Sequence, residues 1–166
     1  NGNHNTAIGH YALHSNYSSH SNTAVGLGAL RNTDGSNNTA IGFYSLHGNS
    51  TGTYNIAHGY EAGHFIANGS TFNETGDYNI FLGPNTKALA DNDQNEIVIG
   101  YNATGAGSNS ATLGNDRITK TVLKGNVGIG TTNPIGTLHI YQSGGSLNYL
   151  EADPSTEDAF IGNIYG

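Results

Sequence analysis

The sequence predicts an all-β chain in which short parallel strands stack into a β-solenoid, or β-roll. Three observations lead to this class: a five-residue motif recurs, its spacing is short, and the composition disfavours helices. Gly, Asn, Thr and Ser make up 78 of the 166 residues, and all four are poor helix formers. Hydrophobic residues account for 35% and charged residues for 10% of the chain. Globular chains typically carry roughly 45–50% and about 25%, so an ordinary Leu-rich core is excluded.

The motif reads Asn-Thr-Ala-Ile-Gly in its clearest copy and always closes on Gly. Successive closing glycines are 17, 16, 17, 24, 17, 14 and 16 residues apart. This period is too short for helix pairs or propeller blades and suits one solenoid coil per copy. The 24-residue interval predicts a loop inserted at about residues 67–77, and such insertions often carry binding. The eight copies are Asn5–Gly9, Asn22–Gly26, Asn38–Gly42, Asn55–Gly59, Asn79–Gly83, Glu96–Gly100, Ser110–Gly114 and Asn126–Gly130.

Aligning the copies produces columns whose members should occupy equivalent places in successive coils. The Gly column predicts a positive φ or a close backbone approach, and the Asn column predicts turn formers. The column before Gly is Ile, Val or Leu except at His58. We expect this column, and the Thr-to-Ile column two residues earlier, to face the inside of each coil.

The column between these two would then face outward. It is small and apolar, and an exposed apolar stripe on a soluble chain usually marks an interface. The stripe therefore predicts contact with further copies of the chain. The residues expected at this interface are Ala7, Ala24, Ala40, Ala57, Phe81 and Val98.

Two sets of segments resemble known fibre proteins. Ile97–Ala103 and Ala111–Asn115, together with the other repeats, resemble the head repeats of trimeric autotransporter adhesins. Gly125–Pro134, followed by Leu138–Ile140, resembles a junction found in bacteriophage tail fibres and related bacterial fibres. The resemblance covers residues 1–140. It implies a homotrimer of left-handed parallel β-rolls that leads into an intertwined trimeric β-structure and attaches to a surface.

The expected organisation has three parts. Residues 1–116 form the head repeats, residues 117–136 a transition segment, and residues 137–166 the start of a small distal β-element. We expect the chain to be a fragment of a longer protein. The strands predicted for the distal element are Thr137–Gln142, Leu147–Glu151 and Ala159–Ile164.

Composition and motifs narrow the function. No nucleophile motif and no phosphate-binding loop before a helix is present, so we expect no catalytic residues and no enzyme activity. A net charge of −7 with five Lys plus Arg argues against nucleic-acid binding, which depends on neutralising phosphates. The apolar runs are also too short for membrane insertion.

Two groups of residues are candidate binding sites. An aromatic cluster beside the inserted loop is a candidate surface for a cell-surface glycan or protein receptor, and local packing of the insertion is an equal alternative. It consists of Tyr54, Tyr60, His64, Phe65, Phe72 and Tyr78. An acidic segment resembles half of a calcium loop, with an acidic turn as the alternative. Apart from Ca²⁺ at this segment, we expect no cofactor. The segment's donors would be Asp91, Asp93, Asn95 and Glu96.

The leading hypothesis is a non-enzymatic, adhesive segment of a homotrimeric extracellular attachment fibre. Such a fibre would stand on a phage or phage-tail-like particle, or on a bacterial surface, and join further fibre or particle components. Two alternatives stay open. One is a depolymerase-bearing tail spike whose catalytic part lies elsewhere, and the other is a surface filament with a structural role alone.

Overall fold

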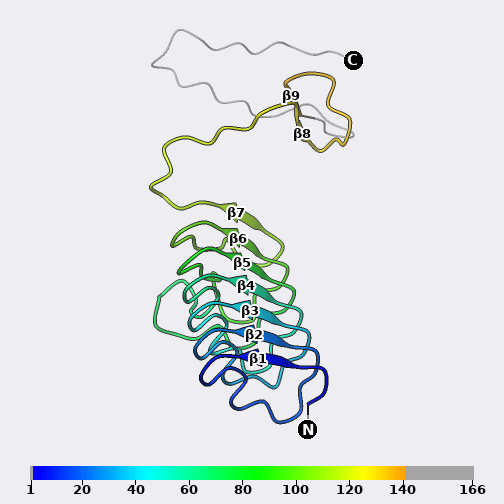
Figure 1. The fold of residues 1–166 in the computed structure, drawn as a ribbon. Helices are drawn as coiled ribbons and strands as arrows, with labels where there is room; N and C mark the ends of the chain where they lie inside the picture. Colours follow the sequence, from blue (N-terminus) through cyan, green and yellow to red (C-terminus); the bar gives the residue numbers. More distant parts are fainter. Residues whose placement is uncertain (1, 141–166) are drawn as a thin grey trace. The chain divides into compact units, whose positions relative to one another are not determined.

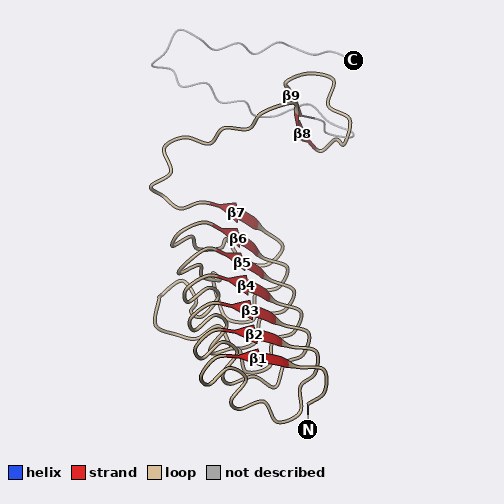
Figure 2. Ribbon diagram, viewed as in Figure 1, coloured by secondary structure: helices blue, strands red, loops and turns tan. Residues whose placement is uncertain are grey.

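The computed structural model describes residues 2–140, and every regular element within them is a short β-strand (Figure 2). Seven strands form one parallel sheet in the order β1-β2-β3-β4-β5-β6-β7. Each coil of the chain adds one strand beside the previous one (Figure 1). The predicted all-β solenoid is therefore confirmed. The seven strands are β1 (Thr6–Ile8), β2 (Thr23–Val25), β3 (Thr39–Ile41), β4 (Ile56–His58), β5 (Ile80–Leu82), β6 (Ile97–Ile99) and β7 (Ala111–Leu113).

The chain divides into two compact units, residues 1–119 and 120–166. The first unit contains the seven-stranded solenoid. In the second, β8 (Val127–Ile129) pairs in parallel with β9 (Leu138–Ile140) as a separate two-stranded sheet. The eighth motif copy thus forms a strand that is not part of the solenoid sheet. The further strands predicted at Leu147–Glu151 and Ala159–Ile164 lie outside the described residues.

The strand register follows the motif alignment. Ala40 of β3 pairs with Ala24 on one side and with Ala57 on the other. The glycine that closes each of these strands has a positive φ, which is 135° at Gly42. A Cβ atom built there would lie 2.3 Å from the carbonyl oxygen of Gly59 in the next coil. The Gly column is required both by the backbone conformation and by the close approach of neighbouring coils.

The direction in which the strands face is opposite to the prediction. The middle residue of each inner strand is buried: Ala24, Ala40, Phe81 and Val98 are 0% exposed and Ala57 is 1% exposed. These residues belong to the core of a single chain, so the interface predicted on the Ala column is wrong. Ala7, in the terminal coil, is exposed. His58 was expected to point inward and is also exposed.

The reason for this reversal is the width of the coil. The wall opposite the sheet supplies its own apolar side chains, including Leu30 and Leu46, which are fully buried. When the opposite wall contributes a Leu side chain, the strand has room to point an Ala side chain inward. It has no room for two columns of β-branched side chains. The remaining residues of the core cluster are Ala29, Ala62, Ala88 and Ala103.

A ladder of buried amides runs along the solenoid beside the strands. In each link, a backbone N–H donates to the side-chain oxygen of the Asn one coil earlier, at 2.8–2.9 Å. The amide nitrogens donate to backbone carbonyls, as Asn38 does to Gly52 at 2.8 Å. The Asn column therefore joins the coils, and the chain bends at the residue before each Asn, as at Asn37 with a φ of 63°. The donors of the five links are Asn22, Asn38, Asn55, Asn79 and Glu96.

Breaking one link should destabilise the fold. Asn38→Leu keeps the side-chain size but removes the oxygen that accepts from the backbone N–H of Asn55. A buried donor without a partner costs about 1–3 kcal/mol, and we expect a loss of that size in chemical denaturation. Asn32→Leu, at an exposed position of the preceding coil, is the control and should change stability little. Equal effects of the two substitutions would contradict a stabilising role for the ladder.

Candidate functional site

The most extensive unusual surface is the outer side of the seven-stranded sheet. Because strands alternate, the first and third residues of each strand point away from the core. Ile8, Ile41, Ile56 and Leu113 are 60%, 36%, 44% and 65% exposed. We call this surface the outward sheet face. It consists of Thr6, Ile8, Thr23, Val25, Thr39, Ile41, Ile56, His58, Ile80, Leu82, Ile97, Ile99, Ala111 and Leu113.

The outward sheet face carries no Asp, Glu, Lys or Arg at these fourteen described positions. His58 is the titratable side chain among them, and it pairs in register with Ile41 on one side and Leu82 on the other. A long, uncharged, largely apolar surface of this kind is typical of interaction sites. The predicted stripe on the Ala column is therefore wrong, and the exposed apolar stripe consists of the two flanking columns that were expected to face inward.

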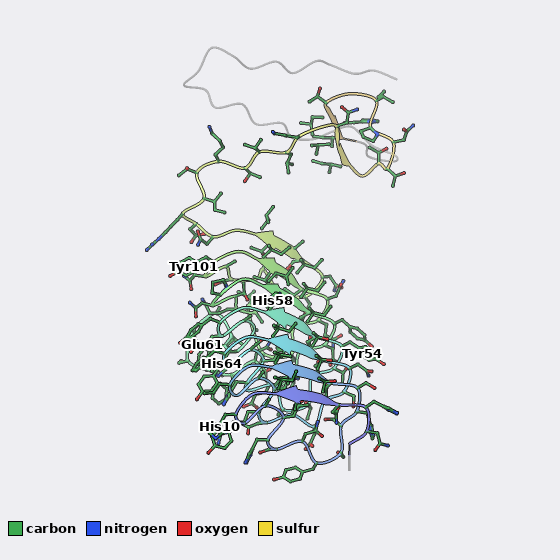
Figure 3. The ribbon with its side chains drawn as sticks, in the orientation of Figure 1. His10, Tyr54, His58, Glu61, His64 and Tyr101 are labelled. Carbon is green, nitrogen blue, oxygen red and sulfur yellow. The ribbon has the colours of Figure 1, made fainter. Side chains whose placement is uncertain are left out.

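The six residues of the predicted aromatic cluster do not form a single surface. His64 and Tyr54 lie at opposite edges of the solenoid (Figure 3). Tyr54 stacks on Tyr78, with ring centroids 5.2 Å apart. Tyr60 stacks on Phe43, which was not predicted, at 5.1 Å.

His64, Phe65 and Phe72 do come together at the base of the inserted loop. The ring of His64 lies 3.9 Å from that of Phe65 and 5.1 Å from that of Phe72. Phe65 and Phe72 face each other in an antiparallel bridge, so the insertion is a hairpin that starts at the coil wall. Since Phe72 is 37% exposed, the cluster serves both to pack the hairpin and to present one aromatic ring.

Two further members of this group were missed, Tyr44 and His47 in the preceding coil. His47 lies 4.9 Å from His64, and Tyr44 lies 4.6 Å from His47, between ring centroids. The sequence contains a periodic signal that places His47 and His64 in one column. Each member of this column stands five residues after a closing Gly: His14, Arg31, His47 and His64. We call Tyr44, His47, His64, Phe65 and Phe72 the insertion cluster.

His64 is the electrostatically unusual member of the insertion cluster. It is 4% exposed, and neither of its ring nitrogens has a hydrogen-bond partner. Burial, with a smaller contribution from His47, lowers the pKa of His64 from 6.5 to about 4. Burial and the charge of Arg31 also lower the pKa of His47. The surroundings of His47 and His64 therefore favour the neutral form of both imidazoles.

Acid should weaken the fold through His64. Its pKa is lower in the folded than in the unfolded chain, so stability should fall as pH drops from 6.5 towards 4, where the unfolded state binds the extra proton. His64→Leu should flatten this part of the melting-temperature profile relative to the wild type. His10→Leu, at an exposed histidine, should follow the wild-type profile. If the melting temperature of His64→Leu fell with pH as steeply as that of the wild type, another group would cause the acid sensitivity.

The predicted calcium ligands do not converge. Burial acts to raise the pKa of Asp91, but hydrogen bonds, including those from the backbone of Glu74 and Thr75 at 2.8 and 2.9 Å, together outweigh it and lower this pKa. Asp93 instead accepts from Ser108 of the next coil, at 2.8 Å through the hydroxyl. Asn95 donates to the side chain of Asn109.

Glu96 is directed into the coil, where its carboxylate accepts from Gly107 N at 2.7 Å. Burial raises the pKa of Glu96, and the charge of Asp93 adds to this shift. These four side chains join neighbouring coils, and the expectation of a shared Ca²⁺ site is wrong. Across residues 2–140, no group of three His, Asp or Glu side chains is placed to hold a metal ion.

The described part of the chain contains no helix long and apolar enough to cross a membrane. Its two distinctive surfaces are the outward sheet face and the edge that carries the insertion cluster. No protein-family model, curated protein or solved structure matches this chain.

Proposed function

We propose that this chain is a structural and adhesive segment of a homotrimeric extracellular attachment fibre, in which the outward sheet face joins the three copies. The observation that carries the proposal is the apolar, uncharged character of that face along seven strands. Such a surface in water favours association.

The character of the face favours a second copy as its partner. Without Asp, Glu, Lys or Arg at its positions, it offers nothing to a strongly charged partner and is complementary to itself. Copies related by a rotation axis parallel to the solenoid place equivalent coils opposite one another. The Thr positions then meet Thr near β1, and the Ile positions meet Ile towards β6. The resemblance to trimeric fibre proteins is the reason for proposing three copies of a left-handed roll, followed by an intertwined trimeric β-structure.

The adhesive part of the proposal concerns the edges of the solenoid. The inserted hairpin after β4 protrudes from one edge (Figure 1), and its residues Asn68, Gly69 and Ser70 are exposed. These edges stay accessible when the outward sheet face is covered. A fibre of this design would present them to a cell-surface glycan or protein receptor without catalysing a reaction. It would belong to a phage, a phage-tail-like particle or a bacterial surface.

Light scattering coupled to gel filtration tests the assembly directly. The expected mass is three times the 17.3 kDa of one chain, and it should persist on dilution. A monomer at all concentrations would overturn the proposal. A stable dimer would retain the outward sheet face as an interface but overturn the trimeric fibre.

A further inference from the structure

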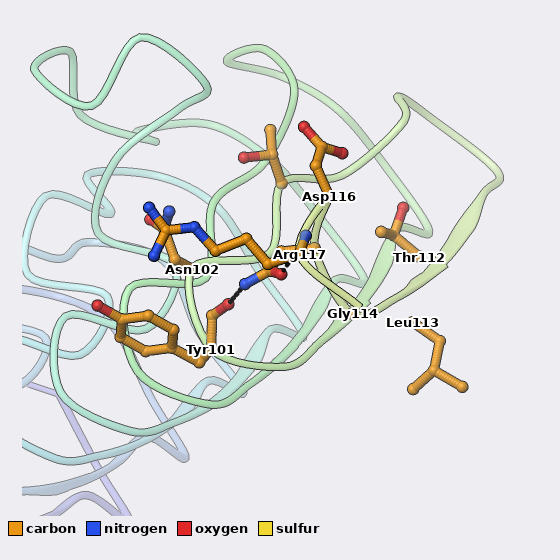
Figure 4. Close-up of a pocket in the computed structure, with 9 residues that line it drawn as sticks. Tyr101, Asn102, Thr112, Leu113, Gly114, Asp116 and Arg117 are labelled. Carbon is orange, nitrogen blue, oxygen red and sulfur yellow. Dashed lines mark hydrogen bonds between the residues drawn. The ribbon is translucent and has the colours of Figure 1, made fainter. Parts of the chain in front are cut away.

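A pocket of about 490 Å³ lies at the last coil of the solenoid, where the chain leaves β7. It is formed within one chain by the turns that follow β6 and β7. Its polar and aromatic lining includes Tyr101, Asn102, Thr104, Asp116 and Arg117 (Figure 4). Leu113 also lines the pocket and belongs to the outward sheet face, whereas the five residues just named belong neither to that face nor to the insertion cluster.

The pocket wall is held by hydrogen bonds of Asn115. Its amide nitrogen donates to the carbonyl oxygen of Tyr101 at 2.5 Å, which fixes the last turn to the coil before it. Its side-chain oxygen accepts from Arg117 N at 2.9 Å, and its carbonyl oxygen accepts from Ile118 N at 3.0 Å. The backbone of Arg117 is therefore positioned by local geometry, and its side chain extends along the pocket (Figure 4).

The lining carries one cation, Arg117, one anion, Asp116, and one aromatic ring, that of Tyr101. Arg117 is exposed, and no hydrogen bond or ion pair of its guanidinium occurs within residues 2–140. Figure 4 shows Asp116 directed to the other side of the pocket from the guanidinium. At the rim, Lys87 Nζ donates to Asn102 Oδ1 at 2.6 Å, which leaves the amide nitrogen of Asn102 free to donate. Arg117 is thus the basic residue that lines the pocket, and Lys87 contacts it through the lining residue Asn102.

We infer that the pocket binds one carboxylate-bearing sugar of an acidic glycan. The guanidinium of Arg117 offers two parallel N–H donors to the sugar carboxylate. The ring of Tyr101, which is 62% exposed, offers a flat apolar surface to the C–H face of the sugar ring. Asn102 and Thr104 supply donors and acceptors for hydroxyl groups.

The inference deepens the adhesive role under the proposed function by naming a ligand class. The net charge of −7 disfavours long polyanions, so a single acidic residue in a mostly neutral glycan fits better. One such site binds weakly and loses affinity as salt screens the ion pair. Three copies on one fibre would raise the overall affinity for a surface that carries many such glycans.

Titration monitored by NMR tests the site with matched probes. Methyl glucuronide and a methyl sialoside carry the carboxylate, and methyl glucoside is the neutral counterpart of the first. Both acidic glycosides should bind at up to about 10 mM, where a site with a Kd of ~1 mM is nearly full. The neutral glycoside should bind at least tenfold more weakly. The shifted amide signals should be those of the turns after β6 and β7.

Variants separate the site from adventitious binding. Arg117→Gln and Tyr101→Ala should each weaken acidic glycoside binding at least tenfold without lowering the melting temperature appreciably. Arg31→Gln should leave binding unchanged, since Arg31 packs on Tyr11 at 4.8 Å in the first coils. Three results would overturn the inference: no acidic glycoside binds, the neutral glycoside binds equally well, or binding survives Arg117→Gln.

The mass of the same samples distinguishes this inference from the fibre proposal. The lining residues come from one chain, so the pocket needs no second copy to form. A trimer that binds no acidic glycoside would overturn the pocket's assignment and leave the fibre intact. A monomer that binds the acidic glycosides would support the pocket's assignment and overturn the trimeric fibre.

Discussion

Replacing Ile56 with glutamate is expected to convert the proposed trimer into folded monomers. Ile56 lies at the centre of the outward sheet face, paired with Thr39 and Ile80. It is 44% exposed in the single chain, so the isolated solenoid tolerates a charge there. In the assembly the same carboxylate would be buried without a partner beside its two copies, which costs several kcal/mol. Since each 1.4 kcal/mol is a factor of ten, association should weaken by more than about a hundredfold.

The neighbouring residue supplies a matched comparison. Ala57 is 1% exposed and faces the core of its own coil, so Ala57→Glu should unfold the chain instead of dissociating it. Thr51→Glu, at an exposed turn outside the outward sheet face, should change neither property. Light scattering reports the mass, and circular dichroism reports the fold. If Ile56→Glu remained trimeric, or if it unfolded while Ala57→Glu stayed native, the assignment of the two faces would be wrong.

The contrast between these adjacent residues also shows how far the sequence determines the fold. The spacing of the closing glycines predicts the coils, and the alignment of the copies predicts the register, because a solenoid repeats its contacts from coil to coil. A three-residue strand has two ways to face, however, and hydrophobicity alone favours the larger Ile side chains inside. The correct choice depends on the opposite wall, where Leu30 and Leu46 already fill the coil. Their spacing after the closing glycines was visible, but the width of the coil was not.

The candidate sites were predictable to a smaller degree. His64, Phe65 and Phe72 meet because they flank one insertion. Tyr54 and Tyr78 are near in sequence to the insertion, yet their column lies at the other edge of the coil. The pocket at Arg117 could not be predicted from the motif, because it forms where the repeat ends and the chain turns away. The period of the repeat predicts where recurring residues lie, but it predicts nothing about segments that interrupt the repeat.

One interruption inside the core leads to the second large expected effect. The buried strand column changes from Ala57 to Phe81 between β4 and β5. The side chain on the opposite wall becomes smaller at the same coil, because Gly63 takes the place that Leu46 holds one coil earlier. A Cβ atom built on Gly63 would lie 2.6 Å from the Phe81 ring and 2.9 Å from the Leu46 side chain. The Phe81 ring therefore occupies the space that a side chain at position 63 would need.

A double-mutant cycle tests this exchange of volume. Phe81→Ala should leave a cavity and cost about 3–5 kcal/mol. Gly63→Leu alone should force a side chain onto the Phe81 ring and destabilise the chain by at least as much. The double variant should recover much of the loss, since it restores the Leu-and-Ala pairing of the coils before it.

The backbone allows the restoration. Leu30 and Leu46 adopt φ values of 47° and 49°, and Gly63 has 64°, so Leu is accommodated in this conformation elsewhere in the solenoid. The coupling energy from chemical denaturation should exceed about 2 kcal/mol, near the upper end for residues in contact. All four proteins must be compared at one chain concentration, because assembly makes stability depend on concentration. Additive effects of the two substitutions would mean that Phe81 and Gly63 do not share the same space.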